Sequence, residues 1–241
     1  MRPALFISDL HLAPERPALT EAFVAFCKNP AREASALYVL GDLFDTWSGD
    51  EQLREPMAAT VASALAAVAS SGVPVAVMRG NRDLLLGDRF MRAAGARDLP
   101  SGTVVDVLGT PTLLLHGDEL CTDDVAFQRY RAVVHDPVRV RRFLALPYFL
   151  RRAIVAWIRR KSRGETVTKT PLMMDVNATA VADALRAHGV TTMIQGHTHR
   201  PARHELDVDG KAAVRWVLPD WRETAVWLEV RPDGAEVRQL P

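Results

Sequence analysis

The stretch ALFISDLH, residues 4–11, contains the pattern that decides the fold. Its four apolar residues predict a short strand that is buried on both faces, as in a parallel sheet. Asp9 and His11 follow this strand two residues apart, so in extended backbone their side chains would point to the same side. The stretch therefore predicts a buried strand that ends in a carboxylate and an imidazole.

The same arrangement, an apolar run followed by a polar cluster, returns four more times. The runs lie at residues 37–40, 75–78, 113–115 and 193–194. The clusters that follow them are, in order, Gly41-Asp42, Gly80-Asn81-Arg82-Asp83, His116-Gly117-Asp118 and Gly196-His197-Thr198-His199. Polar residues at the ends of neighbouring buried strands lie at one edge of a sheet, so we expect the five clusters to converge.

Between these strands the sequence predicts helices, which gives an alternating α/β chain. We expect helices at residues 20–28, 55–70, 88–94 and 175–188, with Thr20 as the N-cap of the first. Turn signals at residues 209–210 and 233–234 predict β-hairpins in the tail. The 241 residues, of which 48% are hydrophobic and 24% charged, fit a single domain over residues 1–241.

Residues 125–172 interrupt the alternation with an arginine-rich helical segment. Asp136 and Pro137 predict a helix start, and Pro147 predicts a break or a restart. Ten arginines and two lysines lie between residues 127 and 169, against two acidic residues, whereas the whole chain has a net charge of +1. This asymmetry indicates where an anionic partner would bind.

Long apolar side chains are interleaved with these arginines. They include Leu144, Leu146, Tyr148, Phe149, Ile154 and Trp157. The apolar face of residues 143–158 has three interpretations: packing on the main domain, a groove for acyl chains, or contact with a membrane. The basic charge favours an anionic lipid surface as the partner.

No apolar run approaches the roughly eighteen residues of a membrane-spanning helix. No secretory signal precedes the first strand, so we expect a cytoplasmic location. Two cysteines, Cys27 and Cys121, are too few for a disulfide framework, and we expect both to be reduced core thiols.

Seven side chains in the clusters are candidate metal ligands. They are Asp9, His11, Asp42, Asn81, His116, His197 and His199. Carboxylate, amide and imidazole ligands without thiolate suit Mn²⁺, Fe²⁺ or Zn²⁺. Seven ligands exceed what one ion takes from a protein, so we expect two ions that share one carboxylate. Two metals about 3.5–4 Å apart can activate water and stabilise both ends of a phosphoryl displacement.

The five clusters, which span residues 9–199, resemble the five motifs of the calcineurin-like metallophosphoesterases. The resemblance implies a four-layer α/β sandwich, in which helices flank two mixed β-sheets and residues 125–172 form a helical lid. It also implies that Asp42 bridges the two ions. The remaining ligands would divide into two sets, Asp9, His11 and His199 for one ion and Asn81, His116 and His197 for the other.

One position departs from the common pattern of the superfamily. The third motif usually reads Gly-Asn-His-Asp, with the histidine acting on the leaving group, and here Arg82 takes its place. Arg82, the stretch HGDELCTDD (residues 116–124) and the basic insertion together resemble the UDP-2,3-diacylglucosamine pyrophosphohydrolases of lipid A biosynthesis. This resemblance extends over residues 174–177 and 216–221.

The resemblance implies hydrolysis of the pyrophosphate bond of UDP-2,3-diacylglucosamine, giving UMP and 2,3-diacylglucosamine 1-phosphate. Water activated by two divalent ions, expected to be Mn²⁺, would attack the α-phosphorus, and the catalytic residues would be Asp42, Arg82 and His197. The substrate contacts would be Asn81, Arg82, Asp124, Ser162, Thr166, Lys169 and His197. Thr166 stands where the family more often has an amide side chain.

Three further acidic residues lie in or beside the clusters. We interpret Asp118 either as orienting His116 or as a turn residue, and Asp83 in a similar way, as a residue that pins Arg82 rather than touching substrate. Asp45 is interpreted as a structural or supporting residue rather than a ligand.

The expected partners are an acylated UDP-sugar and the anionic cytoplasmic face of the inner membrane. Nothing indicates an oligomer. One alternative is a metallophosphoesterase for a soluble nucleotide or phosphodiester, but such a substrate gives no reason for an apolar, arginine-rich lid. Another is a non-catalytic membrane scaffold, but all seven ligand positions are retained. Nucleic acid is disfavoured because few aromatic residues accompany the basic charge.

Overall fold

A computed structural model of the chain describes residues 1–166 and 175–240, and describes the backbone alone for residues 162–166. Its first sheet has the strand order β11-β10-β1-β2-β3-β4. The parallel part contains β1 (Ala4–Ile7), β2 (Ala36–Leu40), β3 (Val75–Met78) and β4 (Arg97–Asp98). The antiparallel strands at the other edge are β10 (Val226–Arg231) and β11 (Gly234–Gln239).

The second sheet has the order β5-β6-β7-β9-β8 and is also mixed. Its strands are β5 (Thr103–Val107), β6 (Thr110–Leu115), β7 (Thr192–Gln195), β8 (Ala202–Val208) and β9 (Lys211–Val217). β6, β7 and β9 are parallel, whereas β5 and β8 pair antiparallel at the two edges. Both expected hairpins are present in the tail, as β8–β9 and β10–β11.

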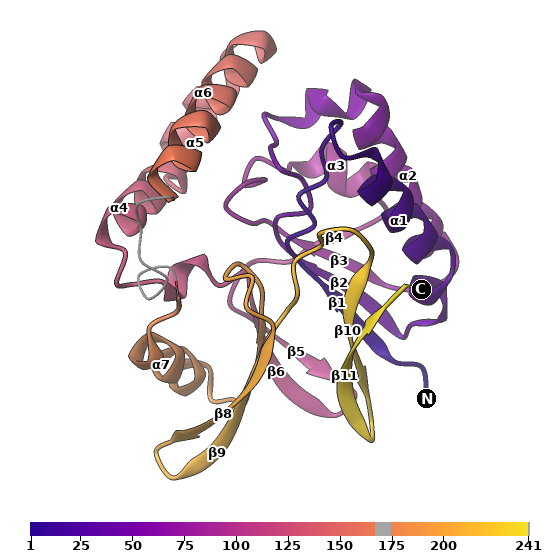
Figure 1. The fold of residues 1–241 in the computed structure, drawn as a ribbon, viewed down its shortest axis with the longest axis vertical. Helices are drawn as coiled ribbons and strands as arrows, with labels where there is room; N and C mark the ends of the chain where they lie inside the picture. Colours follow the sequence, from indigo (N-terminus) through magenta and orange to yellow (C-terminus); the bar gives the residue numbers. More distant parts are fainter. Residues whose placement is uncertain (167–174, 241) are drawn as a thin grey trace.

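Helices cover the outer face of each sheet (Figure 1). The first sheet carries α1 (Pro17–Lys28), α2 (Pro56–Ser70) and α3 (Asp88–Ala93), and the second carries α7 (Ala178–His188). Short 3₁₀ turns occur at η1 (Pro30–Glu33), η2 (Asp50–Arg54) and η3 (Asp118–Leu120). The expected start of the first helix at Thr20 is wrong, because Pro17 occupies the first turn and Arg16 precedes it.

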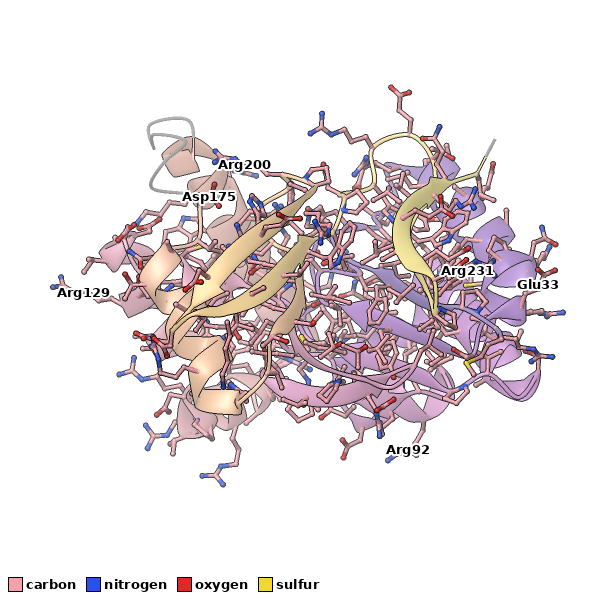
Figure 2. The ribbon with its side chains drawn as sticks, turned by 90° about the horizontal axis from the view of Figure 1, so that it is seen from below. Glu33, Arg92, Arg129, Asp175, Arg200 and Arg231 are labelled. Atoms are coloured by element: carbon pink, nitrogen blue, oxygen red, sulfur yellow. The ribbon has the colours of Figure 1, made fainter. Side chains whose placement is uncertain are left out.

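Successive side chains of β1 point to opposite faces of the first sheet and so belong to different layers of the fold. Leu5 and Ile7 belong to a core shared with α1 and α2, whereas Phe6 belongs to a second core between the two sheets. A third core lies between the second sheet and α7, and contains Met193 and Leu185. Charged side chains such as Arg92 and Arg129 point outward (Figure 2). These three cores make the predicted four-layer sandwich.

The arginine-rich segment forms three helices that lie together, apart from both sheets (Figure 1). They are α4 (Val125–Val134), α5 (Pro137–Leu144) and α6 (Tyr148–Thr166). The Asp136 side chain caps α5, and Pro147 separates α5 from α6 as expected. α4 lies within the helical segment predicted for residues 125–172, but the sequence did not predict its bounds as a separate helix.

None of the apolar side chains of residues 143–158 is buried, so the face does not pack as part of the sandwich core. Phe149 is 74% exposed and Trp157 is 63% exposed. Among the described residues, no helix combines the length and apolar character needed to cross a bilayer. Residues 167–172 of the predicted insertion lie outside the described residues.

Candidate metal centre

The polar clusters lie at the carboxyl ends of β1, β2, β3, β6 and β7, where the two sheets meet. Backbone hydrogen bonds join neighbouring clusters: Asp9 N donates to Gly41 O over 3.2 Å, and Gly196 N donates to His116 O over 3.0 Å. The two sheets are joined by His197 N, which donates to Asp9 Oδ2 over 2.8 Å. The parallel register thus brings residues from distant parts of the sequence to one point.

The backbone at these strand ends is left-handed rather than extended. Positive φ angles occur at Asp9 (56°), His11 (49°), Asp42 (53°), His197 (68°) and His199 (54°). Asp9 and His11 do converge, but the expected reason, an extended backbone, is wrong. Such φ values cost non-glycine residues roughly 1–3 kcal/mol each and gather where function requires them.

Two glycines let the clusters approach one another closely. A Cβ atom on Gly80 would lie 2.1 Å from Asp42 Oδ1, and one on Gly196 would lie 2.4 Å from Asp9 Oδ2. Any side chain at these positions would displace the carboxylates, so both positions require glycine.

The first group of donors consists of Asp9, His11 and His199. His199 Nε2 lies 3.3 Å from Asp9 Oδ1 and 3.2 Å from His11 Nε2. Asp9 Oδ1 and His11 Nδ1 are buried and have no hydrogen-bond partner among the described residues. A buried carboxylate oxygen facing two imidazole nitrogens fits a divalent cation, which would compensate the desolvated charge.

The second group consists of Asp9, Asp42 and His116. His116 Nδ1 donates to Leu40 O over 2.9 Å, which leaves Nε2 to face the site, 3.1 Å from Asn81 Oδ1. The ring of His197 lies at 5.0 Å from the ring of His116. The residues predicted to share one ion therefore do lie together.

Asp42 lies between the two groups. Its Oδ2 is 3.8 Å from His11 Nδ1 and its Oδ1 is 3.6 Å from His116 Nε2. The buried Asp9 is common to both groups as well. Asp9 is thus the shared member, Asp42 lies near a histidine of each group, and a bridge through Asp42 stays a prediction.

A model of the calcineurin-like phosphoesterase family matches residues 2–201, most of the chain. The chain belongs to this family. Its relatives include the UDP-2,3-diacylglucosamine hydrolase of Klebsiella pneumoniae subsp. pneumoniae, 46% identical over 98% of both chains, and that of Escherichia coli O7:K1, 45% identical over 98% of both. Among solved structures, TT1561 of Thermus thermophilus aligns over 99% of this chain and 98% of its own, with 12% identity and a TM-score of 0.48.

Burial and charge set the protonation of this phosphoesterase site. Burial raises the pKa of Asp42 to about 7. Burial also lowers the pKa of His11 to about 3 and that of His197 to about 4, so both imidazoles are neutral at pH 7. For His116, burial acts to lower the pKa, but Asp42 and Asp9 outweigh it and raise the pKa to about 9. The neutral imidazoles of His11 and His197 suit a metal ion, and a bound cation would also favour loss of the protons held by Asp42 and His116.

Arg82 lies beside Asp42. Its Nε is 3.4 Å from Asp42 Oδ2, and its Nη1 donates to Asp45 Oδ1 over 2.7 Å. The expectation that Asp83 pins Arg82 is wrong, because Asp83 accepts hydrogen bonds from the backbone N–H groups of Asp42, Phe44 and Gly80. Asp45, interpreted as a supporting residue, holds Arg82 instead.

The expectation that Asp118 orients His116 is also wrong, because His116 Nδ1 donates to Leu40 O. Asp118 Oδ2 accepts instead from Arg131 Nε of α4 over 2.6 Å. Phe127, also from α4, stacks on the ring of His197 at 5.8 Å. The sequence predicted a helical segment over residues 125–172 but singled out neither Phe127 nor Arg131.

The structure describes some of the predicted substrate-contact residues fully and others only in part or not at all. Asn81, Arg82 and His197 lie at the centre. Asp124 is buried and caps α4 by accepting from Phe127 N over 3.0 Å. Ser162 and Thr166 belong to α6, but their side chains are outside the description, and Lys169 lies outside the described residues.

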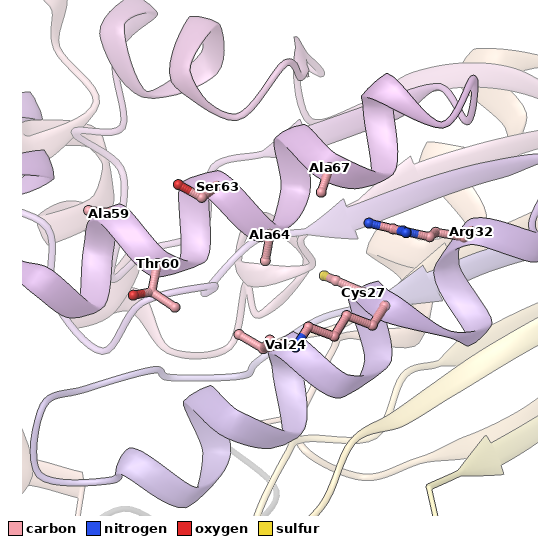
Figure 3. A pocket seen from close by; sticks show the side chains of 9 residues that line it. Val24, Cys27, Arg32, Ala59, Thr60, Ser63, Ala64 and Ala67 are labelled. Carbon is pink, nitrogen blue, oxygen red and sulfur yellow. The ribbon is translucent and has the colours of Figure 1, made fainter.

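One hollow of the described surface lies away from this centre, between α1 and α2. It has a volume of about 430 Å³ and is lined by residues such as Val24, Cys27, Arg32 and Ala64 (Figure 3). It contains no candidate ligand. Cys27 and Cys121 are buried free thiols, as expected, and burial raises the pKa of Cys121 to about 12.

Proposed function

We propose that this phosphoesterase hydrolyses the pyrophosphate bond of UDP-2,3-diacylglucosamine, releasing UMP and 2,3-diacylglucosamine 1-phosphate in lipid A biosynthesis. The observation that carries the proposal is the pair of donor groups, which share Asp9 and lie beside Arg82. The chain also aligns over 98% of its length with proteins named for this substrate. The relatives indicate the substrate, and the donor groups indicate the chemistry.

The donors fit two divalent ions, for which we propose Mn²⁺. Asp9, His11 and His199 would hold one, Asn81, His116 and His197 the other, and Asp42 would contact both. When bound, the ions supply Lewis acidity that activates water and neutralises phosphate oxygens at the α-phosphorus. His116 keeps Nε2 directed at the site because its Nδ1 donates to Leu40 O.

Arg82 would neutralise the departing phosphate. The leaving group is a sugar phosphate, which departs as an anion and needs no proton, so a permanent cation suits it better than an acid. The Arg82 backbone N–H donates to Asp42 Oδ1 over 2.9 Å, which fixes the arginine next to the bridge. His197, between the rings of His116 and Phe127, would lie beside the same phosphate.

The helices α4–α6 would act as a lid that accepts the acylated sugar. Phe149 and Trp157 expose apolar surface, and exposed arginines such as Arg152 and Arg160 flank them. A lipid with an anionic head requires this combination, so we place the protein peripherally on the cytoplasmic face of the inner membrane. Asp124, Ser162, Thr166 and Lys169 complete the proposed substrate contacts.

The test measures UMP release from UDP-2,3-diacylglucosamine with Mn²⁺ and after chelation. Wild-type activity should require metal, and Asp42→Asn should abolish it. Arg82→Ala should lower kcat by about 10²–10³, as loss of one charge-stabilising donor does elsewhere. Asp209→Asn, which alters an exposed ion pair with Arg186, is the matched control and should retain full activity.

Robust turnover of a soluble dinucleotide with none of the lipid substrate would refute this function. Full activity of Arg82→Ala would remove the role given to that arginine.

A further inference from the structure

Asp45 connects the metal centre with the helical lid. Its Oδ1 atom accepts hydrogen bonds from Arg82 Nη1 over 2.7 Å and from Arg159 Nη2 of α6 over 2.6 Å. Asp45 and Arg159 are 114 positions apart in the sequence, so the contact is made by the fold alone. One carboxylate oxygen therefore joins a residue of the centre to a residue of the lid.

The backbone of Asp45 is held in place beside the donors. Its N–H donates to Leu12 O over 3.1 Å, and Leu12 itself forms a β-bridge with Phe44. The side chain of Asp45 is 20% exposed, and those of Arg82 and Arg159 are 24% and 18% exposed. At this depth a charge-assisted hydrogen bond fixes the plane of a guanidinium group more firmly than it does at an open surface.

Arg82 depends on Asp45 for its orientation. A second carboxylate near its guanidinium group is Asp42, at 3.4 Å from Nε, but Asp42 also faces His11 and His116. A carboxylate that contacts metal ions is a weak partner for a guanidinium group. Asp45 is then the group that sets where Arg82 points.

Arg159, the lid residue that contacts Asp45, lies on the face of α6 that is attached to the sandwich. Tyr148 Oη donates to Glu55 over 2.8 Å, and Arg151 donates to Ser48 O over 2.8 Å. Arg159 lies eight positions after Arg151, so the helical period puts it on the same face, about two turns further along. The face that anchors α6 therefore also makes the contact with Asp45.

We propose that Asp45 is a positioning residue that orients Arg82 for the substrate phosphate and makes this orientation depend on the docking of α6 through Arg159. The proposal rests on the proposed function in one respect, namely that Arg82 contacts a phosphate. Without Asp45 the two guanidinium groups lose their common hydrogen-bond acceptor.

A double-mutant cycle tests this role. Asp45→Asn keeps the shape of the side chain but removes its charge, and it should lower kcat about 10–100-fold, as loss of a group supporting an active-site residue does. In the Arg82→Ala background the same change should cause no further loss, because Asp45 acts through Arg82. Asp45→Glu restores the charge and should recover most of the activity.

The link to the lid is tested in the same way. Arg159→Ala should lower kcat, and Asp45→Asn combined with Arg159→Ala should be no less active than Asp45→Asn alone. The matched control is Asp209→Asn, which removes the charge of an exposed aspartate that also pairs with an arginine, Arg186. It should leave kcat unchanged.

Equal losses from Asp45→Asn in the wild-type and Arg82→Ala backgrounds, or failure of Asp45→Glu to recover activity, would overturn the proposal. Additive losses for Asp45→Asn and Arg159→Ala would overturn the link to α6. If the wild type cleaves bis(p-nitrophenyl) phosphate with Mn²⁺ but not the lipid substrate, the proposed function fails. The cycle on that phosphodiester then decides the role of Asp45 separately, by coupling or additivity.

Discussion

Asp83 is fully buried and supports the ligands without facing them. It accepts hydrogen bonds from the backbone N–H groups of Gly80 (2.8 Å), Phe44 (3.2 Å) and Asp42 (3.3 Å). These bonds join the turn after β2 to the turn after β3. The left-handed backbone of Asp42 is held in this way, so its conformational strain is offset by hydrogen bonds rather than by its own side chain.

We predict that Asp83→Ala destabilises the fold by about 3 kcal/mol or more, because it leaves three buried donors without an acceptor. Urea unfolding of the metal-free protein measures this free energy. The matched control is Asp98→Ala, which removes a 39% exposed carboxylate paired with Arg79 and should change stability by less than about 1 kcal/mol. Equal stability of the two variants would show that the three bonds contribute little.

At the scale of elements, α6 is attached to the sandwich through a buried arginine. Arg151 is 2% exposed, and it donates to Ser48 O, Leu146 O and Glu51 Oε1. It fits because Gly49 has no side chain: a Cβ atom there would lie 2.1 Å from Arg151 Nη1. The docking of α6 depends strongly on this contact, since none of its described apolar side chains is buried.

We predict that Gly49→Ala displaces Arg151 and loosens α4–α6, with a loss of roughly 1–3 kcal/mol from overpacking. Limited trypsin digestion should cut the arginine-rich segment faster than in the wild type. Gly72→Ala is the control, since Gly72 also has a positive φ (88°) but a Cβ there would contact nothing within 4 Å. Similar digestion of both variants would mean that backbone strain, rather than Arg151, explains the effect.

The ion pair between Arg151 and Glu51 predicts that the stability of the fold depends on pH. Burial acts to raise the pKa of Glu51, but the hydrogen bond from Arg151 outweighs it and lowers the pKa below the ordinary value of 4.5. A lowered folded-state pKa contributes stability above the unfolded-state value, and this contribution is lost as the pH falls through the folded-state value. The stability difference between wild type and Glu51→Gln should therefore be constant from about pH 8 to 6 and shrink below about pH 4.5, as measured by urea unfolding. A difference that grows in acid would contradict this pairing.

At the scale of the whole molecule, charge and apolar exposure are concentrated on the helices outside the sandwich. The net charge of the chain is +1, yet the segment from residue 127 to 169 holds ten arginines and two lysines. The most exposed large apolar side chains of the described chain beyond the N-terminus, Phe149 and Trp157, lie on α6. The proposed membrane contact would therefore be made by α4–α6, on one side of the molecule.

We predict that the protein binds vesicles of phosphatidylglycerol and phosphatidylcholine in low salt and binds pure phosphatidylcholine weakly. Trp157→Ser should weaken binding by roughly tenfold, because it removes apolar surface that enters the interface. Val237→Ser, which alters a 48% exposed apolar residue of β11, should bind like the wild type. Co-sedimentation measures all three proteins. Equal binding to both kinds of vesicle, or an equal effect of both substitutions, would refute the proposed surface.

The strands and the residues that end them could be predicted from the amino-acid sequence. Runs such as residues 4–7 and 75–78 are apolar at every position, so their burial and the place of the following Asp9 and Asn81 were predictable. The family resemblance then supplied the layer order. The start of α1 was misplaced at Thr20 because Pro17 can occupy a first helical turn, and the bounds of α4 within the predicted helical segment were not predicted.

The orientation of the candidate ligands, and the hydrogen bonds that hold them, in contrast follow from tertiary contacts. The left-handed backbone of Asp9, the hydrogen bonds to Asp83 and the pair formed by Asp45 and Arg159 all depend on contacts between distant segments. Local sequence pattern reports which face of a strand or helix is buried, because burial follows the period of the element. It does not report which of many charged residues will pair, because that choice is made by packing between elements.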